Sequence, residues 1–145
     1  MNLFLDAGPL GQLCNPSHKY RAFQEWLLRT VRLRRHQIFV SEVTIFEVRR
    51  ELLLASLTAS VERLDALSGL LIATTPDAMT WRSSGELWAR LRREGAATAS
   101  DAHVDFDVVL AAEALIYGAV VVTENVRHLA RLVRVLTPAE ARELR

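Results

Sequence analysis

Acidic side chains recur in this sequence close to short apolar runs, at positions where they could bind a metal ion. Asp6 follows an apolar run at the start of the chain, and Asn125 follows a valine-rich run. Glu47 lies about two turns into a predicted helix, while Asp105 and Asp107 open a strongly apolar one. Carboxylates that converge repel one another and are costly to desolvate. Because Mg²⁺ and Mn²⁺ prefer carboxylate oxygen and water, these residues predict a divalent-metal site.

Each acid also has a simpler interpretation when it is taken alone. An aspartate such as Asp6 after a strand can cap a turn. Glu47 could pair with Arg50 or Arg49 on the helix surface, and Glu51, one turn further on, could equally belong to the site. The metal hypothesis therefore depends on all of the acids meeting at one edge of a sheet.

Asp105 and Asp107 compete for one place in the predicted site. Both lie near a predicted helix N-terminus, where the helix dipole alone favours a carboxylate. Two residues along a helix point about 200° apart, so both side chains cannot easily face one metal. If Asp105 instead caps the helix in a non-helical conformation, that objection weakens.

The elements that must position these residues alternate between strand-like and helix-like patterns. Apolar runs predict strands at 2–5, 37–40, 70–73, 119–123 and 133–136. Residues 7–9 read as a sharp turn and 95–100 as a loop. Helical patterns cover 16–34, 42–54, 59–67, 78–93 and 105–117, with a short helix after 125 and a last one from 138.

This alternation predicts the α/β class. It favours a three-layer α/β/α sandwich with a central, mostly parallel sheet of four to five strands, in one domain spanning residues 1–145. Ligands of open parallel sheets bind beyond the carboxyl ends of the strands. That edge is where Asp6 and Asn125 are expected, so the sheet would bring the candidate ligands together.

Composition narrows the classes of protein. The chain has 145 residues, of which 50% are hydrophobic and 24% charged, as in ordinary globular proteins. Cys14 is the single cysteine, which excludes an internal disulfide and a cysteine-based zinc cluster. The longest apolar stretch, 114–122, is too short to span a bilayer. We therefore expect a soluble cytoplasmic protein with no membrane partner. The net charge of +1 does not demand attraction to nucleic acid.

Several segments together resemble the PIN domain, in its order and approximate spacing. They are 3–6, 40–47, 107–112 and 121–129. The most specific pieces are D-x-x-L-A-A from Asp107 and T-x-N ending at Asn125, and the resemblance covers nearly the whole chain. PIN domains are metal-dependent ribonucleases, many of them VapC-like toxins of bacterial toxin–antitoxin pairs. The resemblance implies that Asp6, Glu47 and Asp107 are the catalytic, metal-binding acids. Asn125 would stand at the variable fourth position, and Asp105 is a further candidate ligand.

The chain departs from this family pattern at two places. Many members carry Thr or Ser and then a small polar residue after the first acid, where this chain has Ala7-Gly8. Asn125 replaces an aspartate found in many relatives, which lowers the charge on the site. The resemblance implies a Mg²⁺- or Mn²⁺-dependent endoribonuclease that hydrolyses RNA phosphodiester bonds, as the toxin of a pair. The alternative is a PIN-like module that binds RNA or protein without cutting.

Other chemistries find less support in the residues. A receiver domain needs a lysine near its last strands, but Lys19 is the single lysine. A haloacid-dehalogenase-like enzyme needs a second aspartate where this chain has Gly8. Cys14 is isolated, which disfavours nucleophilic catalysis, and we interpret His128 as a packing or substrate-contact residue.

The predicted partners are an RNA substrate, an antitoxin protein and a second copy of the chain. Stripes around Trp26 and around Trp81 and Trp88 offer more apolar surface than a thin sandwich must bury. Toxin-type relatives commonly form dimers, so we expect a homodimer.

Overall fold

The computed structural model describes residues 1–94 and 101–144, so the predicted loop at 95–100 lies outside the described residues. The strands are β1 (Asn2–Leu5), β2 (Gln37–Ser41), β3 (Ile72–Thr74), β4 (Val120–Val122) and β5 (Val135–Leu136). The helices are α1 (Ala7–Cys14), α2 (Arg21–Arg32), α3 (Glu42–Leu54), α4 (Thr58–Leu70), α5 (Ala78–Arg93), α6 (Asp101–Ile116), α7 (Val126–Leu129) and α8 (Pro138–Arg142), with a 3-10 turn, η1, at His18–Tyr20.

The five strands form one parallel sheet in the order β3-β2-β1-β4-β5. β1 lies at its centre, where Leu5 pairs with Val40 of β2 on one side and with Val122 of β4 on the other. These three strands therefore end within one residue of one another. This confirms the predicted fold class and brings the carboxyl ends of β1, β2 and β4 to one edge.

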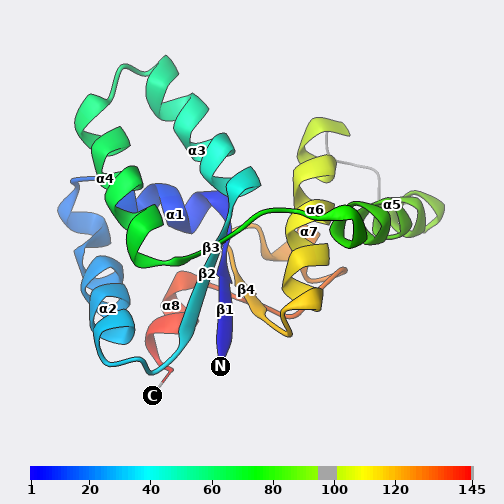
Figure 1. The fold of residues 1–145 in the computed structure, drawn as a ribbon. Helices are drawn as coiled ribbons and strands as arrows, with labels where there is room; N and C mark the ends of the chain where they lie inside the picture. Colours follow the sequence, from blue (N-terminus) through cyan, green and yellow to red (C-terminus); the bar gives the residue numbers. More distant parts are fainter. Residues whose placement is uncertain (95–100, 145) are drawn as a thin grey trace.

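Helices cover both faces of the sheet, as Figure 1 shows. On one face, Leu3, Leu5 and Val40 pack with residues of α1, α2, α3 and α4. On the other face, Phe4 and Val121 pack with residues of α5, α6 and α7. No helix in the described part of the chain is long and apolar enough to cross a membrane.

Helix α1 replaces the turn that was predicted at residues 7–9. Asp6 caps this helix, because its side chain accepts a hydrogen bond from the backbone N–H of Ala7. Pro9 falls in the first helical turn, where the N–H that proline lacks would have no partner within the helix. Leu10 and Leu13 are then buried against the sheet. The prediction was wrong because Gly8-Pro9, a turn signal elsewhere, is compatible with a helix start.

Helix α6 begins at Asp101, four residues earlier than the predicted start at Asp105. Asp105 therefore lies inside the helix, and the prediction that it could cap the helix N-terminus is wrong. The predicted end of the helix holds, since Gly118 adopts a positive φ of 57° just beyond it.

The tryptophans differ in their surroundings. Trp26 is 3% exposed and stacks on Phe23, with ring centroids 5.5 Å apart, so it belongs to the core. Trp81 and Trp88, on α5, are 55% and 39% exposed. Of the two stripes, the one on α5 leaves apolar surface in solvent.

Candidate metal centre

Asp6 is held in place at the end of the central strand. Its backbone N–H donates to Val122 O at 3.0 Å, which extends the pairing of β1 with β4. One carboxylate oxygen accepts from the backbone N–H of Ala7 at 2.7 Å, and the other accepts from Thr123 Oγ1 at 2.6 Å. Burial raises the pKa of Asp6, while the hydrogen bonds from Thr123 and Ala7 oppose that rise. The carboxylate is thus half-buried, oriented and close to the sheet edge.

Thr123 is a residue of this site that the sequence analysis did not select. It is fully buried, and its hydroxyl donates to Asp6 while accepting from the backbone N–H of Asn125 at 2.8 Å. The signal for it is the register in which Leu5 pairs with Val122, because the next residues, Asp6 and Thr123, must then lie side by side. Which strands are neighbours was not known from the sequence.

We expect Thr123→Val to weaken Mn²⁺ binding by about 10–100-fold, because the residue that orients a metal ligand is typically worth that much. The valine keeps the buried shape but removes the hydroxyl that links Asp6 to the chain before Asn125. Thr123→Ser, which keeps the hydroxyl, is the matched control. Calorimetric titration with Mn²⁺ checks this, and equal affinity in Thr123→Val and wild type would exclude the orienting role.

The pKa of Asp107 reports on the acids around it. Its pKa is raised from 3.8 to about 7, first by burial and then by the negative charges of Asp6 and Glu47. The three carboxylates therefore lie near enough to one another for their charges to interact, and we call them the three-carboxylate site (Asp6, Glu47 and Asp107). They come from the end of β1, from α3 and from α6. The acids that the PIN resemblance selected thus act on one another's charge, although they are far apart in the sequence.

Asp105 and Asn125 are more exposed to solvent than Asp6, Glu47 and Asp107. Asp105 is exposed and lies two residues before Asp107 inside α6, so the two side chains leave the helix about 200° apart. Asn125 is also exposed, but its backbone is linked to Asp6 through the Thr123 hydroxyl. Asp105 and Asp107 therefore lie on different faces of α6, and the backbone of Asn125 is joined to Asp6 through Thr123.

The donor set of this site suits a hard divalent cation. Carboxylate oxygens are the ligands that Mg²⁺ and Mn²⁺ prefer, and a cation would relieve the repulsion that raises the pKa of Asp107. In the described part of the chain, no three His, Cys, Asp or Glu side chains are already arranged to hold a metal ion. Mg²⁺ commonly keeps several waters and takes one or two carboxylates, so a closed protein cage is not required. The residues therefore fit the ion in chemistry and charge.

The chain is similar to known proteins in its fold. No protein-family model matches the sequence, and no curated protein sequence matches it significantly. Solved structures do match. A chain of VapBC2 from Rickettsia felis, bound to a promoter DNA fragment, has a TM-score of 0.76 at 18% identity, covering 94% of this chain and 98% of that one.

Two further solved structures give the same result. A chain of FitAcB from Neisseria gonorrhoeae has a TM-score of 0.74 at 18% identity, over 94% of this chain and 98% of that one. A chain of DNA-bound VapBC from Salmonella typhimurium has a TM-score of 0.66 at 22% identity, over 95% and 98%. The chain therefore has the VapC-like, PIN-domain fold that its sequence predicted, shared with chains of the VapBC and FitAB complexes.

Proposed function

We propose that this protein, as one domain spanning residues 1–145, is a metal-dependent endoribonuclease and the toxin of a toxin–antitoxin pair, acting in the cytoplasm. The observation that carries the proposal is the raised pKa of Asp107, about 7, which burial and then the negative charges of Asp6 and Glu47 produce. The fold shared with chains of the VapBC and FitAB complexes supports the same function.

The three acids would hold Mg²⁺ or Mn²⁺, and this chain's part is to position them. A bound divalent cation lowers the pKa of water and neutralises charge on the phosphodiester. Asp6 is fixed by Thr123 and by the N-terminus of α1, so it enters the reaction without reorganisation. Asp107 must be ionised to bind the metal, and its raised pKa makes that step costly until the cation arrives.

The test is incubation of purified protein with labelled RNA in Mn²⁺ and, as control, in EDTA. We expect cleavage in Mn²⁺ alone. Attack by water leaves ends without a 2′,3′-cyclic phosphate, whereas attack by the ribose 2′-hydroxyl forms one, so analysis of the ends separates this activity from a contaminating metal-independent ribonuclease. Binding of RNA without any cleavage would favour the alternative, a PIN-like binding module.

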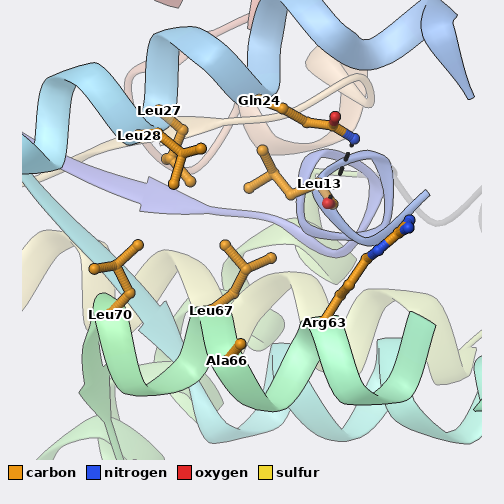
Figure 2. A pocket seen from close by; sticks show the side chains of 8 residues that line it. All are labelled: Leu13, Gln24, Leu27, Leu28, Arg63, Ala66, Leu67 and Leu70. Atoms are coloured by element: carbon orange, nitrogen blue, oxygen red, sulfur yellow. Dashed lines mark hydrogen bonds between the residues drawn. The ribbon is translucent and has the colours of Figure 1, made fainter. Parts of the chain in front are cut away.

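An apolar groove between α1, α2 and α4 is the surface that we propose for the antitoxin. It encloses about 260 Å³, and Figure 2 shows the side chains that line it. They are mainly aliphatic: Leu13, Leu27, Leu28, Ala66, Leu67 and Leu70, with Gln24 and Arg63. Gln24 Nε2 donates to carbonyl oxygens at the end of α1, including that of Asn15 at 2.7 Å, so the groove is built on fixed helices.

Leu28 and Leu70 are 52% and 46% exposed, which leaves apolar surface for an apolar segment of a partner to cover. We expect Leu70→Glu to abolish co-purification with the product of the neighbouring reading frame. Leu54→Glu is the matched control, because Leu54 is 83% exposed at the end of α3. A complex that survives Leu70→Glu and is lost with Leu54→Glu would place the partner elsewhere.

We propose a homodimer in which the exposed α5 tryptophans, Trp81 and Trp88, take part. Burial of two large aromatic side chains is a common source of interface stability. Light scattering at tens of micromolar should give the mass of two chains, and Trp81→Glu should shift it toward one. A monomeric mass for the wild-type protein at that concentration would contradict the homodimer.

A further inference from the structure

Two aromatic side chains contact each other across α3 and α6, the two helices that carry Glu47 and Asp107. Phe46 directly precedes Glu47 on α3, and Phe106 directly precedes Asp107 on α6. Their ring centroids lie 6.3 Å apart, with an interplanar angle of 56°. Phe46 is 53% exposed, so a large apolar ring stands in solvent at the position just before Glu47.

Arg50 joins these rings. Its guanidinium carbon lies 5.6 Å from the centroid of the Phe46 ring and 5.2 Å from that of Phe106, which are cation–π distances to both. Its Nε also lies 3.5 Å from Glu51 Oε1. Arg50 is exposed and sits one helical turn after Glu47. We call these three residues the aromatic–arginine cluster (Phe46, Arg50 and Phe106).

The chemistry of this cluster matches a nucleotide better than a protein surface. Unpaired bases stack on aromatic rings and on arginine guanidinium planes, and the guanidinium also attracts phosphate. A purely apolar protein surface laid over Phe46 would bury the Arg50 charge at a desolvation cost, whereas RNA offers a base and a phosphate together. Because Phe46 and Phe106 directly precede Glu47 and Asp107 in the chain, a nucleotide bound at the acids would be within reach of the cluster.

We infer that the aromatic–arginine cluster is a stacking subsite for an unpaired nucleobase of single-stranded RNA. This inference rests on the proposed function and adds to it the residues that would bind a base of the substrate. Bases inside an A-form duplex are stacked on one another and cannot reach the ring of Phe46. The protein should therefore select RNA with an unpaired nucleotide at the site of cleavage.

The test measures binding apart from cleavage. Every variant carries Asp107→Asn, so that the RNA stays intact, and the probe is a short single-stranded RNA with the fluorescent base 2-aminopurine placed at each position in turn. Stacking on Phe46 should quench the fluorescence of 2-aminopurine at one position of the RNA. Phe46→Ala should remove that quenching and weaken binding roughly tenfold or more. Phe46→Trp should restore both, and Leu54→Ala, which removes an exposed apolar side chain at the end of the same helix, should change neither.

Two further measurements complete the test. Arg50→Gln should lower the slope of log affinity against log salt by about one. A duplex of the same sequence should bind more weakly than the single strand. Unchanged affinity and quenching in Phe46→Ala would overturn the inference, and so would a Phe46→Ala protein that binds RNA normally but has lost a protein–protein contact by mass. If the wild-type protein cleaves no RNA while Phe46→Ala still loses quenching and affinity, the subsite stands and the nuclease proposal fails.

Discussion

Asp107→Asn should reduce Mn²⁺-dependent RNA cleavage by more than about 100-fold, because loss of a direct metal ligand should exceed the 10–100-fold effect of a residue that only orients one. In EDTA the same variant should melt at a temperature equal to or higher than that of the wild type. The reason is that asparagine keeps the side-chain shape while removing the charge that Asp6 and Glu47 repel. Activity and stability should thus change in opposite directions.

The matched control for Asp107→Asn is Asp105→Asn, which makes the same chemical change two residues earlier in α6. Asp105 is exposed and lies on a different face of α6 from Asp107, so this variant should keep most of the activity. Melting curves with and without Mn²⁺, together with cleavage rates, give both quantities. If Asp105→Asn loses activity and Asp107→Asn does not, the third acid is misassigned by two residues.

The second large effect is on the stability of the folded chain, whose dependence on pH reverses when metal is added. Without metal, Asp107 is protonated in the folded chain up to a pH of about 7, while in the unfolded chain it ionises near its ordinary pKa of 3.8. Between these values the folded state binds more protons, so its stability falls as pH rises and then levels off above about pH 7. The melting difference between Asp107→Asn and wild type in EDTA should be near zero at about pH 4 and largest at about pH 8.

With Mn²⁺ the dependence has the opposite sign, because the metal binds the ionised carboxylate and displaces its proton. Below a pH of about 7, the Mn²⁺ affinity should rise about tenfold per pH unit and then level off. Melting temperatures over this range, in EDTA and in Mn²⁺, check both arms. A melting difference between variant and wild type that does not change with pH would show that Asp107 is not the strongly shifted group.

Much of this fold could be predicted from hydrophobic patterning. The four strands β1, β2, β4 and β5 and the helices α3 and α5 lie where alternating apolar runs placed them, and α5 begins and ends at the predicted residues, Ala78 and Arg93. β3 begins at Ile72 rather than at 70, because Leu70 completes α4 and the buried Leu71 lies between the two elements. Such boundaries depend on packing, which a pattern of residue types does not specify.

Strand ends and the PIN resemblance predicted that Asp6, Glu47 and Asp107 form one site. They did not predict the residues that hold these acids and their helices in place. Thr123 became part of the site through the pairing of β1 with β4. Glu113 lies in the middle of the apolar helix α6, fully buried, where it accepts a hydrogen bond from Thr74 Oγ1 at 2.8 Å. Both residues act through partners more than 30 positions away in the sequence, so even the T-x-N motif that contains Thr123 does not reveal which side chain its hydroxyl binds.

The central claim is that Asp6, Glu47 and Asp107 form one metal site, and Mn²⁺ titration calorimetry tests it most directly. The proteins to compare are the wild type, Asp6→Asn, Glu47→Gln and Asp107→Asn, with Asp105→Asn as the variant that changes the same charge outside the site. We predict that the wild type and Asp105→Asn bind Mn²⁺ alike, while each of the other three variants loses binding by more than about 100-fold. Equal Mn²⁺ affinity in all five proteins, or loss of binding in Asp105→Asn alone, would contradict the claim.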